Sequence, residues 1–141
     1  MSTVYKFWAA VVSIGVVIQV GFAGYGAFYV AHTIDNNEPK AITEKGFEDG
    51  FGAHASFGYL VGLAGILLLV IAAIGRQGGR RIKRTGLLAG LFVLQVILAL
   101  VGFGVPAVGA LHPINALLIV GLSFMITIDA WGWRHGAAVS D

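Results

Sequence analysis

Four long apolar runs, separated by short clusters of charge, restrict this chain more than any other feature of its sequence. The runs cover residues 7–31, 54–75, 85–103 and 112–133. A helix needs about 20 apolar residues to cross a hydrocarbon core of about 30 Å. Of the 141 residues, 57% are hydrophobic and only 11% are charged, which is typical of a chain surrounded by the lipid bilayer. We therefore predict an all-α fold, an integral membrane four-helix bundle, with residues 1–141 forming a single transmembrane domain.

The basic residues predict how this bundle lies in the membrane. Lys6 precedes the first run and Arg134 follows the last, and five more lie between the second and third runs: Arg76, Arg80, Arg81, Lys83 and Arg84. Cytoplasmic connections carry the excess of Lys and Arg. We therefore predict insertion in the cytoplasmic (inner) membrane, with both termini and the basic loop 76–84 in the cytoplasm, and with residues 32–53 and 104–111 outside. Because topology explains the net charge of +2, we predict no nucleic acid partner.

The chain contains no cysteine. A disulfide, a thiolate metal site and the Cys-x-x-Cys-His attachment of a covalent haem are therefore excluded, and other side chains must hold any cofactor. The first apolar run, of about 25 residues, is longer than the core of a secretory signal. We expect it to remain in the protein as a helix.

An internal repeat relates the two halves of the chain. The sequence IQVGFAGYG at 18–26 resembles LQVILALVG at 94–102, which pairs Gln19 with Gln95. The sequence HASFGYLVGL from His54 resembles HPINALLIVGL from His112, with a small residue four positions later, Gly58 or Ala116. The repeat predicts two helical hairpins related by a pseudo-two-fold axis along the membrane normal.

The paired histidines predict a cofactor. In a bundle traced up, down, up, down, the second and fourth helices stand diagonally across the core, so His54 and His112 are expected to face each other at similar depth. Two facing imidazoles are the axial ligands of a six-coordinate haem iron. Gly58, Gly62 and Gly65 follow His54 on one helical stripe, and we expect the flat macrocycle of haem b to pack on this stripe, with Ala116 at the equivalent place in the second half.

Each of these features also has an ordinary structural interpretation. Small residues spaced four apart allow close helix packing in lipid without a cofactor. A histidine at the end of a span can be a hydrated interfacial residue, and His112, which precedes Pro113, can cap the last helix. Paired ligation is the preferred interpretation because ionisable groups inside a membrane are usually functional.

Other polar residues have less definite roles. His32 ends the first run, and we place it level with the histidine pair, where it could bond a haem propionate or serve as an alternative ligand. Gln19 and Gln95 could bond each other, bond a quinone-like carbonyl or, more simply, join helices. We expect His135 to be solvated and Asp129 to pair with Arg134 or Lys6.

His54 and His112 at the starts of the second and fourth helices also resemble one four-helix half of heme A synthase, a membrane enzyme in which each half presents such a pair to a haem. The chain looks, too, like small uncharacterised bacterial four-helix membrane proteins, through the segment LHPINALLIVGL. The resemblance implies axial ligation by His54 and His112 alone. The synthase half that acts on substrate haem has a carboxylate three residues before its second-helix histidine, where this chain has Phe51. The resemblance therefore implies a bound haem b without haem oxidation.

These observations predict a bis-histidine, cytochrome b-like membrane protein that transfers electrons or serves as a subunit of a membrane redox complex, with no catalytic residues of its own. A quinone or a membrane redox partner, and an oligomer or larger complex, are consistent with this role. The alternative is a cofactor-free accessory subunit that packs on larger membrane proteins through its glycine-rich faces. A transporter is third, because the runs hold few groups that could line an aqueous path.

Overall fold

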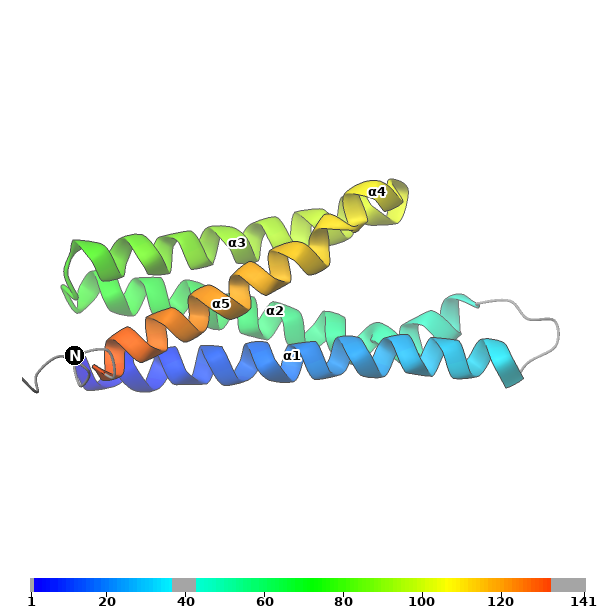
Figure 1. Cartoon of the computed structure of the whole chain (residues 1–141), viewed down its shortest axis with the longest axis horizontal. Coiled ribbons are helices and arrows are strands. Elements are labelled where there is room, and N and C mark those ends of the chain that lie inside the picture. Colours follow the sequence, from blue (N-terminus) through cyan, green and yellow to red (C-terminus); the bar gives the residue numbers. More distant parts are fainter. Residues whose placement is uncertain (1, 37–42, 133–141) are drawn as a thin grey trace, which may run out of the picture.

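The computed structural model describes residues 2–36 and 43–132, and these residues are almost entirely helical. Four long helices and one short one follow each other along the chain (Figure 1): α1 Ser2–Asn36, α2 Glu44–Ile74, α3 Gly79–Gly104, α4 Pro106–Gly109 and α5 Leu111–Trp131. Four segments are long and apolar enough to cross a membrane, the last of them formed by α4 and α5 together. The predicted all-α, four-helix membrane fold is confirmed.

The four long helices form a square in which each helix packs on two neighbours. α1 packs against α2 and α5, and α3 packs against the same two helices. Within the described residues, α1 has no close backbone contact with α3, and α2 has none with α5. These two pairs therefore stand on the diagonals, as an up, down, up, down trace requires.

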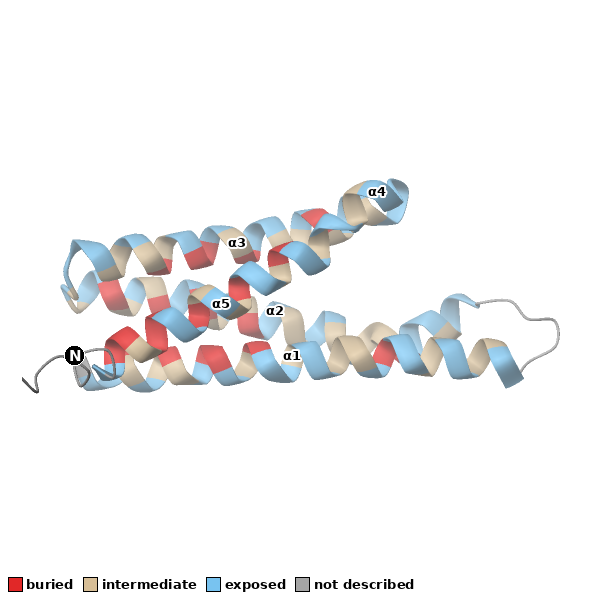
Figure 2. Ribbon diagram, in the orientation of Figure 1, coloured by how far each residue is buried: buried red, intermediate tan, exposed pale blue. Residues whose placement is uncertain are grey.

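The core lies in the half of the bundle that holds the N-terminus (Figure 2). Tyr5, Ala9, Val12 and Val16 recur at helical spacing on the inner face of α1 and are buried. The other helices add buried residues to the same cluster, among them Leu68, Ala72, Leu88, Phe92, Ile119 and Ile126. Large apolar residues such as Phe28 and Leu117 point outward. An apolar exterior is what a bundle surrounded by lipid requires, since lipid tails are as apolar as a leucine.

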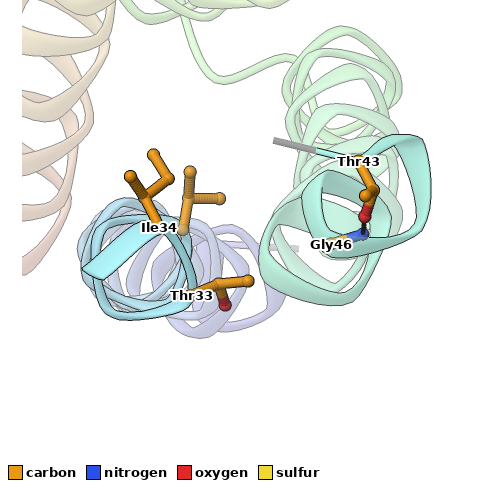
Figure 3. A pocket seen from close by; sticks show the side chains of 5 residues that line it. Thr33, Ile34, Thr43 and Gly46 are labelled. Carbon is orange, nitrogen blue, oxygen red and sulfur yellow. Dashed lines mark hydrogen bonds between the residues drawn. The ribbon is translucent and has the colours of Figure 1, made fainter. Parts of the chain in front are cut away.

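The C-terminal end of α1 and the N-terminal end of α2 extend beyond the rest of the bundle (Figure 1). With 35 and 31 residues, the two helices are about 52 and 46 Å long, much longer than a hydrocarbon core of about 30 Å. Residues 44–53, predicted as part of an outer loop, are helical instead. Thr43 caps α2 by accepting a hydrogen bond of 3.0 Å from the N–H of Gly46 (Figure 3).

A crevice between these two projecting ends is too narrow to admit a water molecule. Val30, Thr33, Ile34, Thr43 and Gly46 line it (Figure 3). It therefore offers no room for a cofactor.

At the opposite end of the bundle, a short turn joins α2 to α3. Gly78 adopts φ +87° just before α3 begins, a conformation that residues with a side chain rarely adopt. The predicted basic loop 76–84 is therefore mostly helix, because α3 begins at Gly79 and its first turns carry Arg80, Arg81, Lys83 and Arg84.

Candidate histidine site

His54 and His112 lie on the diagonal helices and face each other across the bundle. Their ring centroids are 6.2 Å apart, with an angle of 64° between the ring planes. His54 lies in the third turn of α2 and His112 in the first turn of α5, and both are half-buried. The ring of Phe51 contacts His54 edge-on, with centroids 6.3 Å apart. The structure therefore brings together the two residues that the repeat singled out.

Each histidine is paired with the equivalent glutamine of the repeat. The Nδ1 atom of His112 lies 3.1 Å from the carbonyl oxygen of Gln95, and that of His54 lies 3.3 Å from the carbonyl oxygen of Gln19. A carbonyl oxygen only accepts, so in the contact of His112 the ring nitrogen is the donor and carries the proton. A proton on Nδ1 leaves the Nε2 lone pair of a neutral imidazole available to a metal. His54 has a second contact, because the side-chain amide nitrogen of Gln19, which only donates, lies 3.0 Å from its Nδ1 and 3.4 Å from its Nε2.

The side chains of the two glutamines behave differently. The amide of Gln19 donates a bond of 2.7 Å to the carbonyl oxygen of His54 and lies 3.0 Å from its Nδ1. The side-chain oxygen of Gln95 instead accepts a bond of 2.6 Å from Asn115, which also donates to the carbonyl oxygen of Leu91 at 2.9 Å. Each glutamine thus joins the two helices of its own hairpin. Interhelical bonding is confirmed, and a direct bond between the two glutamines is not formed.

Two acceptors beside the site are buried without a hydrogen-bond donor: Gln19 Oε1 and Asn115 Oδ1. Asn115 is only 4% exposed. Sequence reasoning passed over Asn115, although an amide within an apolar run is itself a sign of an interhelical bond. Buried acceptors of this kind are ordinarily met by a water molecule or a ligand.

The pair supplies two nitrogen ligands, which is fewer than most metal ions take from a protein. Within the part of the chain that the structure describes, no three His, Cys, Asp or Glu residues gather into a metal site. Zinc takes about four protein ligands, whereas a haem iron needs only two because the porphyrin supplies four nitrogens.

The glycine stripe below His54 is only partly open. A side-chain carbon at Gly58 would lie 2.7 Å from the amide nitrogen of Gln19, and one at Gly65 would overlap the ring of Phe92. At Gly62 nothing lies within 4 Å. The bare surface expected for a macrocycle is therefore filled by protein at Gly58 and Gly65 and remains open at Gly62, while Ala116 is half-buried at the matching place on α5.

His32 lies far from the histidine pair. It is exposed near the end of α1, where the side-chain amide of Asn36 contacts its Nδ1 at 3.1 Å. The residue of α1 that is level with His54 is Gln19, and the 13 intervening helical steps correspond to about 20 Å. The expectation that His32 lies level with the pair is thus corrected. His135 lies outside the described residues.

A shallow apolar groove lies open on the exterior of the bundle, between α1 and the residue before His54. It is lined by Ile18, Gly21, Phe22, Tyr25 and Ala53. Only Ala53 connects this groove with the histidine pair.

Asp129, at the other end of the bundle, has different partners from those predicted. Its carboxylate is 2.6 Å from Arg80, 3.6 Å from Arg84 and 3.8 Å from Arg81. The expected pairing with Lys6 is wrong, because the ion pairs of Asp129 among the described residues are with these three arginines. Lys6 instead accepts a bond from Trp131 through its backbone oxygen. Arg134 lies outside the described residues.

No protein-family model, no curated protein sequence and no solved structure matches this chain.

Proposed function

We propose that this chain is a haem b-binding membrane protein that carries single electrons, alone or as the haem subunit of a larger membrane complex. His54 and His112 would hold the iron through a ring nitrogen each. Haem b, when bound, supplies a reversible one-electron change at the iron. The single observation that carries the proposal is the facing pair of imidazoles, with ring centroids 6.2 Å apart, each with its Nδ1 near the backbone carbonyl of an equivalent glutamine.

The residues around the pair have separate roles in this proposal. With two imidazoles as its protein ligands, a bound haem would favour electron transfer over oxygen activation. The carbonyl of Gln95 would hold the His112 ring with its proton on Nδ1. The apolar surroundings exclude water, and the groove beside His54 provides a place where a lipid-soluble partner such as a quinone approaches.

The membrane and its orientation follow from the distribution of basic residues. Arg76, Arg80, Arg81, Lys83 and Arg84 gather where α2 joins α3. We assign this end to the cytoplasm of the inner membrane, together with both chain termini, by the excess of positive charge on cytoplasmic connections. The histidine pair then lies toward the outer face.

The proposal is tested by the visible spectrum and the pyridine haemochrome of the purified full chain, expressed with ample haem. We expect one haem b per chain with sharp reduced α and Soret bands. His54→Ala and His112→Ala should each remove most of the six-coordinate spectrum, and His32→Ala should leave it unchanged because His32 lies about 20 Å away along α1. A colourless wild-type protein, or histidine variants that keep the spectrum, would refute the proposal.

A second candidate is a cofactor-free accessory subunit. It is favoured by glycines that have open space where a side chain would stand, including Gly21, Gly24, Gly62 and Gly90. Bare glycines on a lipid-facing helix allow another helix to approach closely. This candidate expects a colourless protein that co-purifies with a membrane partner, so the haemochrome measurement separates the two functions.

A further inference from the structure

Three arginines from the start of α3 surround one carboxylate. Arg80 contacts Asp129 at 2.6 Å, and Arg84 and Arg81 approach it at 3.6 and 3.8 Å. Arg81 also donates a bond of 3.3 Å to the backbone oxygen of Asp129, and its guanidinium carbon lies 5.6 Å from the centre of the Tyr5 ring. The Asp129 side chain is only 8% exposed, whereas the Arg80 side chain is 68% exposed. The three guanidinium groups are thus held together, with one of them open to the surroundings.

One carboxylate does not balance the charge at this end of the bundle. The described residues here include six basic side chains, Lys6, Arg76, Arg80, Arg81, Lys83 and Arg84, and Asp129 is the single acidic one among them. The Nη1 atom of Arg84 is buried and faces Asp129 Oδ2 at 3.6 Å, slightly beyond hydrogen-bond distance. The positive charge of this cluster therefore exceeds the charge of its one carboxylate, and the exposed guanidinium of Arg80 is where a further anion can approach.

The position of the cluster indicates what this anion is. Arg80, Arg84 and Leu87 follow each other at helical spacing on one face of α3, and Leu87 is exposed. The cluster lies where α3 begins, at the end of a span. A phospholipid whose headgroup meets Arg80 and Arg84 would therefore lay its acyl chain along Leu87. Guanidinium groups bind phosphate oxygens in a bidentate manner.

We propose that Arg80, Arg81 and Arg84, organised by Asp129, form a binding site for the phosphate headgroup of an anionic phospholipid. The lipid phosphate meets the exposed guanidinium of Arg80 and neutralises part of the excess charge, while Asp129 keeps the guanidinium groups from repelling each other. This proposal does not depend on the presence of haem.

The test compares the full chain in nanodiscs of phosphatidylcholine alone and of phosphatidylglycerol alone. We expect phosphatidylglycerol to raise the thermal unfolding midpoint and to remain bound in native mass spectrometry. The double variant Arg80→Gln/Arg84→Gln should weaken this lipid binding by about fivefold for each lost charge. The matched control Arg76→Gln/Lys83→Gln removes the same number of charges from exposed residues that make no ion pair with Asp129 in the described structure, and it should keep most of the binding.

Asp129→Asn provides a second measurement that leaves all the arginines in place. The uncompensated arginines should lower the unfolding midpoint in phosphatidylcholine, and phosphatidylglycerol should restore most of it. The proposal is overturned if the two lipids stabilise the wild type equally, if the control variant loses binding as much as the arginine variant, or if inorganic phosphate added in phosphatidylcholine reproduces the full effect. The last result would assign the site to a soluble anion.

Discussion

His112 is oriented by a backbone carbonyl, and no side-chain substitution at Gln95 removes that acceptor. His54 also has a backbone carbonyl beside its Nδ1, that of Gln19 at 3.3 Å, but the side-chain amide of Gln19 lies closer to the same nitrogen, at 3.0 Å. The side chains of these glutamines add a second level of support, which differs between the halves. Gln19 bonds the backbone of His54 itself, whereas Gln95 bonds Asn115, three residues after His112. Both halves of the repeat therefore place a backbone carbonyl beside the histidine ring, whereas the side-chain hydrogen bonds around the two histidines differ.

The amide of Gln19 explains why residue 58 is a glycine. Gly58→Ala places a carbon 2.7 Å from the Gln19 amide nitrogen, so the amide must move and lose its bond to His54. We expect a loss of about 1 kcal/mol of unfolding free energy. In a Gln19→Ala background the same substitution should cost almost nothing.

A double-mutant cycle on the unfolding midpoint measures this coupling directly. Gly62→Ala is the matched control, because a side chain there has open space. Additive effects of Gly58→Ala and Gln19→Ala would show that Gly58 serves some purpose other than making room for the amide.

Sequence reasoning reached the histidine pair because both residues stand at the same place in two similar segments. It could not reach Asn115 as a partner of Gln95, since the repeat has Phe57 at the equivalent place in the first half. It also assigned Gly58 to a cofactor surface, because a glycine in a sequence does not reveal which neighbour needs the space. Contacts between residues of different helices depend on the rotation of each helix, and spacing along one helix does not fix that rotation.

At the scale of the elements, the crossing of α3 and α4 decides where α5 begins. Gly102 and Gly109 meet backbone to backbone, and a side-chain carbon at Gly102 would lie 2.6 Å from the Cα of Gly109. Because the obstructing atom belongs to the backbone, a side chain at Gly102 could be accommodated only if α4 moved away from α3. Because α5 follows after Ala110, this contact also positions His112.

Gly102→Ala is therefore expected to destabilise the bundle by about 1–3 kcal/mol and to displace the start of α5. Gly104→Ala is the control, since nothing lies within 4 Å of a side chain there. The unfolding midpoints of the two variants in a denaturing detergent titration give the comparison. Equal midpoints would mean that the chain re-forms this turn without the glycine contact.

The sequence was sufficient to predict the four long helices. In lipid a spanning segment must satisfy its own backbone hydrogen bonds, and a single apolar run does so only as a helix. The ends of these helices were not predicted. The predicted loops 32–53 and 76–84 contain the beginnings of α2 and α3, since charged residues end a membrane span without ending a helix. Polar residues such as Glu48 and Arg80 are compatible with helix once the chain has left the hydrocarbon.

At the scale of the whole molecule, most acidic residues lie at one end of the bundle and most basic residues at the other. The described acidic residues other than Asp129, namely Asp35, Glu44, Glu48 and Asp49, lie at the end where α1 meets α2. Apart from Lys45, which pairs with Asp49 at 2.9 Å, the described basic residues gather at the other end, around Asp129. The up, down, up, down trace of the chain was enough to predict which helices stand on the diagonals. It did not predict the partner of Asp129, because α5 packs on α3 as well as on α1, and either neighbour could supply a basic residue.

The proposed orientation can be measured in a chain that has no cysteine of its own. Asp35→Cys and Lys83→Cys each introduce one thiol at an exposed residue, one at each end of the bundle. Because basic connections stay in the cytoplasm, a membrane-impermeant maleimide should label the Asp35 variant in intact spheroplasts and the Lys83 variant only after the membrane is opened. The unsubstituted chain, which has no thiol, gives the background. The reverse pattern would place the arginine cluster outside and the histidine pair near the cytoplasm, so that any electron partner would have to approach His54 from the other leaflet.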